Sequence, residues 1–87
     1  MVTKLYKFWA PWCGPCRQMK PIVEKVLATR PDIQLVEFNV DEMERDYLST
    51  FNVSSVPTLV LDVGSKRAVK IGACSESQLA EWIDGNL

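Results

Sequence analysis

The sequence predicts a single α/β domain, in which a mixed four-stranded sheet is flanked by three helices in the order β-α-β-α-β-β-α. The chain has 87 residues, 47% of them apolar, which is enough for one domain and one small core (residues 1–87). Apolar residues recur at helical spacing after Cys16, and Thr58–Val63 is a continuous apolar run typical of a strand buried on both faces. Together these features favour strands alternating with helices.

The first half of the chain is predicted to form a strand, a long helix and a second strand. Val2–Phe8 places Val, Leu, Tyr and Phe between lysines, which is a strand pattern. Cys16–Thr29 is helical, because one helix face collects apolar residues: Met19, Ile22, Val23, Val26 and Leu27. Pro21 is expected to kink this helix rather than end it. Ile33–Val40 forms the second strand, and the helix between the strands makes them parallel.

The second half begins with a short helix and a hairpin. Met43–Phe51 is predicted as the helix, with Asp41 as its N-cap. Thr58–Val63 and Arg67–Ile71 flank the turn-like Gly64-Ser65-Lys66 and are predicted to pair as a hairpin.

The last element is a helix with clear boundary signals. Ser75 opens it, and Gln78 three residues later completes a capping box. The helix is expected to run to about Asp84, where Gly85 ends it.

Composition excludes several classes of function. The net charge of −1, from 10 basic and 11 acidic residues, gives no indication of nucleic-acid binding. No apolar stretch is long enough to span a membrane, and Lys4 and Lys7 interrupt the start where a signal peptide needs an apolar run. The absence of histidine excludes Cys–His proteases and histidine metal sites. Three cysteines are too few for a disulfide scaffold.

The Cys13-Gly14-Pro15-Cys16 segment carries the predicted chemistry. It follows a strand and opens a helix, so Cys13 is expected at the helix N-terminus, where free N–H groups and the helix dipole favour a thiolate. Cys13 would attack a substrate disulfide, and the more buried Cys16 would resolve the mixed disulfide. Gly14 lets a partner approach, and Pro15 stiffens an early helical position. The alternative, half of a metal site, needs a second ligand pair that Cys74 alone does not supply.

The sequence resembles the thioredoxin family along essentially its whole length. The segment Phe8–Arg17, FWAPWCGPCR, is a highly specific match. Pro21 stands where family members carry a helix proline, and Asn39-Val40-Asp41 resembles the end of their central parallel strand. Val56-Pro57-Thr58 and Lys70-Ile71-Gly72-Ala73 resemble the two segments that lie beside the active cysteines.

This resemblance implies a substrate groove around the cysteines. Pro57 is expected to follow a cis peptide bond, although most X-Pro bonds in folded proteins are trans. Val56 and Ile71 are expected to offer backbone contacts to an extended substrate, and Gly72 helps complete the groove. Trp12 is expected to flank the site.

Two departures from the family pattern stand out. Typical family members carry a further strand and helix before the strand that leads into the motif, and these are expected to be absent here. The minimal thioredoxin fold would then remain, with Ile33–Val40 as an edge strand. Gln34 and Glu37 either discourage pairing at this edge or belong to a partner surface. In addition, Lys7 stands where relatives carry a buried aspartate, and Glu37 stands where they carry its lysine partner.

The second departure predicts a reversed ion pair between Lys7 and Glu37. A buried charge needs a partner, and the two changes are complementary. Glu37 would accept the proton that Cys16 loses, or Lys7 would lower a cysteine pKa through its charge. The alternative is that both side chains reach water.

Three other residues have structural and functional interpretations. Cys74 is either a regulatory or dimerising thiol or, as favoured, a small buried apolar side chain. Trp9 and Trp82 are expected in the core, with Trp9 behind the active site. Arg17 either adds positive potential near Cys13 or is a solvated helix charge.

The leading prediction is a cytoplasmic, monomeric protein-disulfide reductase that needs no bound cofactor. Its partners would be disulfide-containing client proteins and a thioredoxin reductase or similar electron donor, without nucleic acid or membrane. One alternative is a glutathione-dependent, glutaredoxin-type reductase, although Ala73-Cys74-Ser75 does not resemble the glycine-rich segment that holds glutathione. The other is a non-catalytic binding module that keeps the fold without redox turnover.

Overall fold

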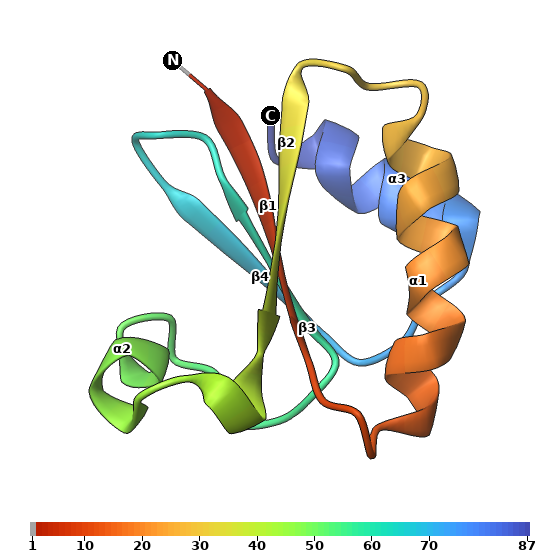
Figure 1. The fold of residues 1–87 in the computed structure, drawn as a ribbon. Helices are drawn as coiled ribbons and strands as arrows, with labels where there is room; N and C mark the ends of the chain where they lie inside the picture. The colour runs from red at the N-terminus through yellow and green to blue at the C-terminus, as the bar shows by residue number, and fades with distance from the viewer. Residues whose placement is uncertain (1) are drawn as a thin grey trace.

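The computed structural model describes residues 2–87 and contains the predicted strands and helices in the predicted order (Figure 1). A short 3₁₀ turn, η1, precedes the second helix. The elements are β1 (Thr3–Trp9), α1 (Gly14–Leu27), β2 (Ile33–Asn39), η1 (Val40–Glu42), α2 (Arg45–Ser49), β3 (Thr58–Asp62), β4 (Arg67–Ile71) and α3 (Glu76–Gly85).

The four strands form one mixed sheet in the order β2-β1-β3-β4. β1 and β2 are parallel, as the helical crossover between them predicts, and β3 is antiparallel to both β1 and β4. The predicted hairpin of β3 and β4 is therefore confirmed. β2 lies at one edge of the sheet, as predicted.

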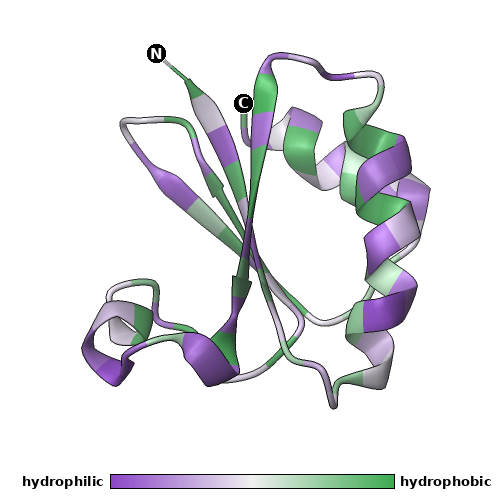
Figure 2. Ribbon diagram, viewed as in Figure 1, coloured by the Kyte–Doolittle hydropathy of each residue, from purple (hydrophilic) through white to green (hydrophobic). Residues whose placement is uncertain are grey.

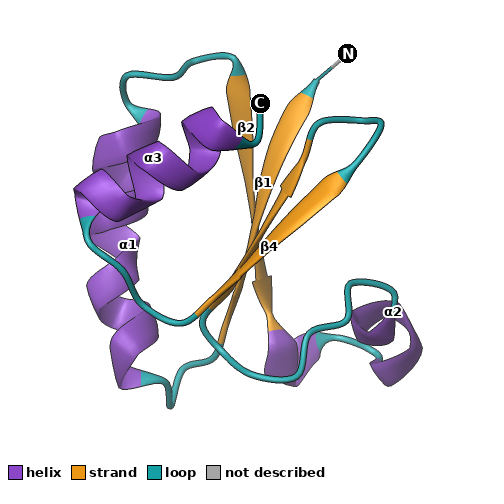
Figure 3. Ribbon diagram, turned by 180° about the vertical axis from the view of Figure 1, so that it is seen from behind, coloured by secondary structure: helices purple, strands orange, loops and turns teal. Residues whose placement is uncertain are grey.

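Helices cover both faces of the sheet, and each face has its own core. Figures 1 and 3 show α1 and α3 on one face and α2 on the other. Figure 2 shows bands of hydrophobic and hydrophilic residues alternating along α1, as expected for a helix with one buried face. The main core between the sheet, α1 and α3 consists of Leu5, Met19, Val23, Val26, Ile33, Leu59, Leu61, Leu79 and Ile83. The core on the opposite face consists of Phe8, Phe51 and Val60.

The boundaries of the first two helices differ from the prediction. α1 begins at Gly14 rather than Cys16, because Cys13 itself caps the helix: its Sγ accepts the Cys16 backbone N–H at 3.2 Å. Pro21 lies inside α1 without ending it. Asp41 is not the N-cap of α2; that position is Glu44, whose side chain makes no capping hydrogen bond.

The prediction for Asp41 is wrong because the chain turns earlier. The Asn39 side chain accepts the Asp41 backbone N–H at 3.0 Å and starts η1 directly after β2. The last helix agrees with its prediction, since Ser75 and Gln78 form both hydrogen bonds of the capping box. Across residues 2–87, the helices lack the combination of length and apolarity that crossing a membrane requires.

Candidate functional site

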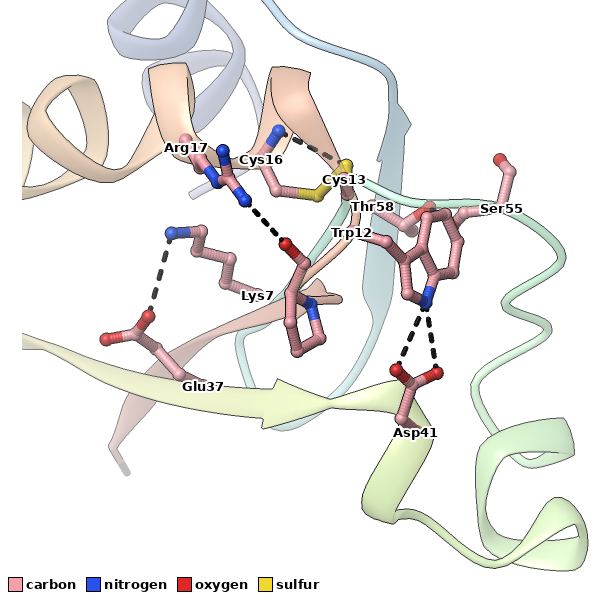
Figure 4. The surroundings of a disulfide bond; sticks show 10 residues. Lys7, Trp12, Cys13, Cys16, Arg17, Glu37, Asp41, Ser55 and Thr58 are labelled. Atoms are coloured by element: carbon pink, nitrogen blue, oxygen red, sulfur yellow. Dashed lines mark hydrogen bonds and ion pairs between the residues drawn. A yellow bond between two sulfur atoms is a disulfide. The ribbon is translucent and has the colours of Figure 1, made fainter.

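The first turn of α1 places two cysteines together at the end of β1. Cys13 and Cys16 are joined by a disulfide, with their Cα atoms 5.3 Å apart (Figure 4). Both side chains are almost buried, at 5% and 3% exposure, so the expected difference in burial between them is small. With Ala10 they form a small apolar cluster, against which Trp9, Val40 and Val56 pack.

The backbone around Cys13 suits a negatively charged sulfur. Cys13 is the N-cap of α1, and the Cys16 N–H already points at its Sγ. The first turn contains no acidic residue that would oppose an anion there. Gly14 and Pro15 occupy the first helical positions, and a Cβ added at Gly14 would meet no atom within 4 Å. Packing within the chain therefore does not require glycine at that position, and the space beside it is open.

The loop before β3 approaches the cysteines from the other side. The Val56–Pro57 peptide bond is cis, as predicted. Val56 packs against the cysteine cluster, and the Pro57 carbonyl accepts the Gly72 backbone N–H at 2.9 Å. Thr58 and Ile71 are neighbours in the sheet, so the start of β3 and the end of β4 are held side by side.

Trp12 and Ile71 are the two most exposed large side chains that the sequence assigns to the site. Trp12 is 68% exposed and Ile71 is 66% exposed. Trp12 also forms one wall of a hollow of about 190 Å³, together with Val40 and Val56 among others. The predicted groove residues come from three separate segments: Val56 packs against the cysteines, and the Gly72 hydrogen bond ties the third segment to Pro57.

Asp41 has a contact that its predicted capping role did not suggest. Its two carboxylate oxygens accept the Trp12 indole N–H at 3.1 and 3.3 Å, and Figure 4 shows the ring held against the end of β2. The only sequence signal for this residue was the resemblance of Asn39-Val40-Asp41 to the family's strand end. Local pattern favoured a helix cap instead.

The predicted ion pair between Lys7 and Glu37 is present. The two residues are directly opposite each other in the parallel β1–β2 ladder, and Lys7 Nζ lies 3.6 Å from Glu37 Oε2. The Lys7 side chain is 3% exposed and that of Glu37 is 40% exposed. Lys7 is therefore the buried member of the pair, and Glu37 reaches water. A role for the pair in catalysis stays a prediction.

Lys7 and Glu37 share a hollow with one of the cysteines. This hollow, here called the Cys16 hollow, has a volume of about 230 Å³. Its lining includes Lys7, Cys16, Arg17, Lys20 and Glu37. Arg17 lies over it and donates a hydrogen bond from Nη2 to the Pro11 carbonyl at 3.0 Å.

Cys74 packs against the main core and is not among the residues of the disulfide cluster. Its backbone N–H is 3.4 Å from Met19 Sδ, and its side chain is partly buried. Burial raises the pKa of the Cys74 thiol, and the nearby Lys70 charge opposes that effect only in part. This setting agrees with the favoured interpretation of a small apolar side chain. Trp82 also packs against the main core, and Trp9 packs behind the disulfide, as predicted.

The chain is similar to known proteins along nearly its full length. The family model described as Thioredoxin matches residues 2–85. A thioredoxin of Pseudomonas aeruginosa is 36% identical over 85 residues, which cover 95% of this chain and 78% of that protein. A thioredoxin of Rhodospirillum rubrum is 37% identical over 82 residues, with 92% and 78% covered.

Solved structures of thioredoxin-fold proteins are also similar to this chain along nearly its full length. The oxidised form of mitochondrial thioredoxin 3 from Saccharomyces cerevisiae superimposes with a TM-score of 0.84 at 32% identity, covering 95% of this chain and 77% of that one. A structure that addresses thiol resolution in a yeast mitochondrial 1-Cys peroxiredoxin through glutathione and thioredoxin systems has a TM-score of 0.85 at 30% identity, with 97% and 78% covered. With the disulfide of Cys13 and Cys16 at a helix N-terminus, these matches show that the chain belongs to the thioredoxin family of dithiol protein-disulfide oxidoreductases.

Proposed function

We propose that Cys13 is the nucleophile and Cys16 the resolving thiol of this protein-disulfide reductase. The observation that carries this assignment is the position of Cys13 Sγ at the N-cap of α1, where it accepts a helix N–H. Backbone N–H groups at a helix N-terminus stabilise an anion, so Cys13 forms the reactive thiolate more readily. Cys16 lies within the first turn, one step further into the helix.

The proposed cycle moves two electrons and two protons to the client. Cys13 thiolate attacks one sulfur of the client disulfide, forms a mixed disulfide and releases the first client sulfur as a thiolate. Cys16 then loses its proton and attacks Cys13 Sγ. This step closes the Cys13–Cys16 disulfide and releases the second client sulfur. The client thiolates take up the proton from Cys16 and one from solvent.

The client is proposed to lie across the two exposed apolar side chains beside the disulfide. Trp12 and Ile71 offer apolar surface, and an extended client backbone would pair with Val56 in the manner of an added strand. The open space at Gly14 allows the client backbone to approach closely. The full set proposed to contact the client is Trp12, Gly14, Pro15, Val56, Pro57, Ile71 and Gly72.

The ion pair between Lys7 and Glu37 is proposed to assist the loss of a proton from Cys16. Lys7 and Glu37 line the same hollow as Cys16, and Lys7 is the buried charge there, so this pair is positioned to influence the proton loss of Cys16. We propose further that the protein acts as a monomer in the cytoplasm, where dithiols are kept reduced, and that it takes electrons from a thioredoxin reductase.

Reduction of insulin by dithiothreitol tests the catalytic assignment. The wild-type chain is expected to accelerate the precipitation of the freed insulin chains, and Cys13→Ser is expected to lower the rate to that of dithiothreitol alone. Cys74→Ser is the matched control, since it removes the cysteine that takes no part in the disulfide. Full activity in Cys13→Ser would disprove the assignment of the nucleophile.

A second assay identifies the electron donor. The oxidised chain is incubated either with NADPH and a thioredoxin reductase or with glutathione, and free thiols are counted over time. Rapid reduction only by the reductase is the expected result. Rapid reduction by glutathione alone would assign the chain to the glutathione-dependent class instead.

A further inference from the structure

A buried cation lines the same hollow as one of the two cysteines. Lys7 is 3% exposed, and it lines the Cys16 hollow together with Cys16 itself (Figure 4). Its counter-ion Glu37 is 40% exposed, so water screens the carboxylate far more than the ammonium group. The two charges therefore do not cancel at the cysteines.

The other two charged groups around the hollow, Arg17 and Lys20, are also cations, but both are exposed, so water screens their charges as it screens that of Glu37. Lys7 enters from β1 and Glu37 from β2, and Arg17 and Lys20 enter from α1. Among the charged residues that line this hollow, Lys7 is therefore the one that is buried. A positive field in a partly dry site stabilises a thiolate more strongly than it would in water.

This field acts on only one redox state of the cysteine pair. The disulfide is neutral and gains little from a nearby cation. The reduced pair gains whenever one of its thiols is ionised. The free-energy difference between the two states therefore shifts toward the reduced form, which raises the reduction potential of the pair.

We propose that Lys7 is a positioning residue that holds the reduced Cys13–Cys16 pair as a thiolate and raises its reduction potential, with Glu37 keeping Lys7 in place. This proposal rests on the proposed function of the two cysteines, and it states in which direction Lys7 shifts their reduction potential. The protein then accepts two electrons from a donor more readily than it would with a carboxylate at position 7. In the resolving step, Cys16 gives up its proton more easily because Lys7 stabilises the sulfur anion that attacks Cys13.

An exchange of the two charges tests this proposal while keeping an ion pair. In the double variant Lys7→Glu, Glu37→Lys, the buried charge becomes negative. The equilibrium of the oxidised chain with dithiothreitol or glutathione is expected to shift about tenfold toward the disulfide, which corresponds to a potential about 30 mV lower. Thiolate absorbance of the reduced chain is expected to appear at higher pH than in the wild type. The difference in potential should grow as pH rises, because the field acts only on ionised sulfur.

The chain offers a matched control in an ion pair between two helices. Lys25 Nζ and Glu76 Oε1 form an exposed ion pair, 3.3 Å apart, between α1 and α3. The exchange Lys25→Glu, Glu76→Lys changes the same residue types away from the Cys16 hollow, and it is expected to leave the potential unchanged.

The outcomes separate a redox role from a merely structural one. An unchanged potential and thiolate titration in the folded Lys7/Glu37 exchange variant would overturn the proposal. If that variant does not fold, Lys7→Met decides the question, because it keeps the apolar stem and should shift the potential in the same direction by a smaller amount. Equilibration with dithiothreitol needs no client protein, so these readouts remain valid even if the chain fails to reduce insulin.

Discussion

Cys13 and Cys16 have similar burial but different backbone settings. Cys13 is outside the helical hydrogen-bond pattern, in extended conformation at φ −90° and ψ 105°. Cys16 is inside α1, and its own N–H is donated to Cys13 Sγ. A thiolate on Cys13 is therefore stabilised by helix N–H groups, and Cys16 depends on the side chains around its hollow for the same purpose.

Replacement of the resolving thiol is predicted to trap the client. In Cys16→Ser, Cys13 still attacks a client disulfide, but no second thiol displaces the client from the mixed disulfide. Catalysed insulin reduction is expected to fall to the rate of dithiothreitol alone. Non-reducing electrophoresis and intact-mass measurement should show a covalent adduct with the client that dithiothreitol removes.

The corresponding variant of the nucleophile provides the contrast. Cys13→Ser is expected to form no such adduct, because Cys16 lies inside α1 and lacks the N-cap position that stabilises a thiolate on Cys13. Equal adduct yields from the two variants would contradict the assigned roles.

At the scale of elements, the β3–β4 hairpin depends on one carboxylate. Asp62 Oδ1 accepts the Gly64 backbone N–H at 2.8 Å, and its Oδ2 accepts the Arg67 Nε–H at 3.2 Å. The hydrogen bond from Gly64 is the main cause that lowers the Asp62 pKa; desolvation opposes it, and Arg67 adds to the lowering. The turn that the sequence marked with Gly64-Ser65-Lys66 is thus stabilised by a residue at the end of the preceding strand.

The stabilising effect of Asp62 is predicted to disappear in acid. Because the folded-state pKa is lowered, its contribution is complete above the unfolded-state value of about 3.9 and is lost as pH falls through the folded-state value. Asp62→Asn is expected to reduce the free energy of unfolding by about 1 kcal/mol at pH 7. Urea unfolding should show this difference shrinking between pH 7 and pH 3.

A carboxylate in an exposed turn serves as the control for Asp62. Asp32→Asn, in the turn before β2, is expected to change stability little at either pH. A difference between wild type and Asp62→Asn that stays constant down to pH 3 would contradict the electrostatic explanation.

On the scale of the whole molecule, the sheet separates two cores of different composition. The core beneath α1 and α3 is mainly aliphatic, whereas the opposite core contains a group of aromatic rings around Phe51. Arg67 covers part of that aromatic group, with its guanidinium carbon 4.7 Å from the centre of the Phe51 ring. The disulfide lies at one end of the sheet, so both cores support the elements that carry it.

The packing of α3 against the main core is predicted to contribute a large share of the free energy of unfolding. Leu79 is fully buried in the main core, and Leu79→Ala is expected to cost about 2–5 kcal/mol because it leaves a cavity. Domains of this kind have total stabilities of about 5–15 kcal/mol, so the variant should be close to its folding limit. Urea unfolding monitored by tryptophan fluorescence measures the change.

Leu87→Ala is the matched control, since Leu87 is 58% exposed. Its effect is expected to stay within about 0.5 kcal/mol. A similar loss in both leucine variants would show that α3 does not depend on the main core.

The sequence by itself determined the features that local pattern encodes. Helical spacing predicted α1, the Ser75–Gln78 capping box predicted the start of α3, and the Cys-x-x-Cys segment after a strand predicted a disulfide at a helix N-terminus. Each of these depends on residues within a few positions of one another. The physical signals for them are therefore complete in short stretches of chain.

Tertiary structure alone decided which side chains meet across the sheet. Trp12 and Asp41 are 29 residues apart, and their hydrogen bond arises because β2 returns parallel to β1 and ends beside the cysteine turn. Asp41 was therefore misread as a helix cap, since no local pattern contains its partner. The Lys7–Glu37 pair was predicted only through the family resemblance, and the fold decided that Lys7 is buried and Glu37 reaches water. Strand pairing across a helical crossover is a long-range property, and it determines which charges line the hollow beside Cys16.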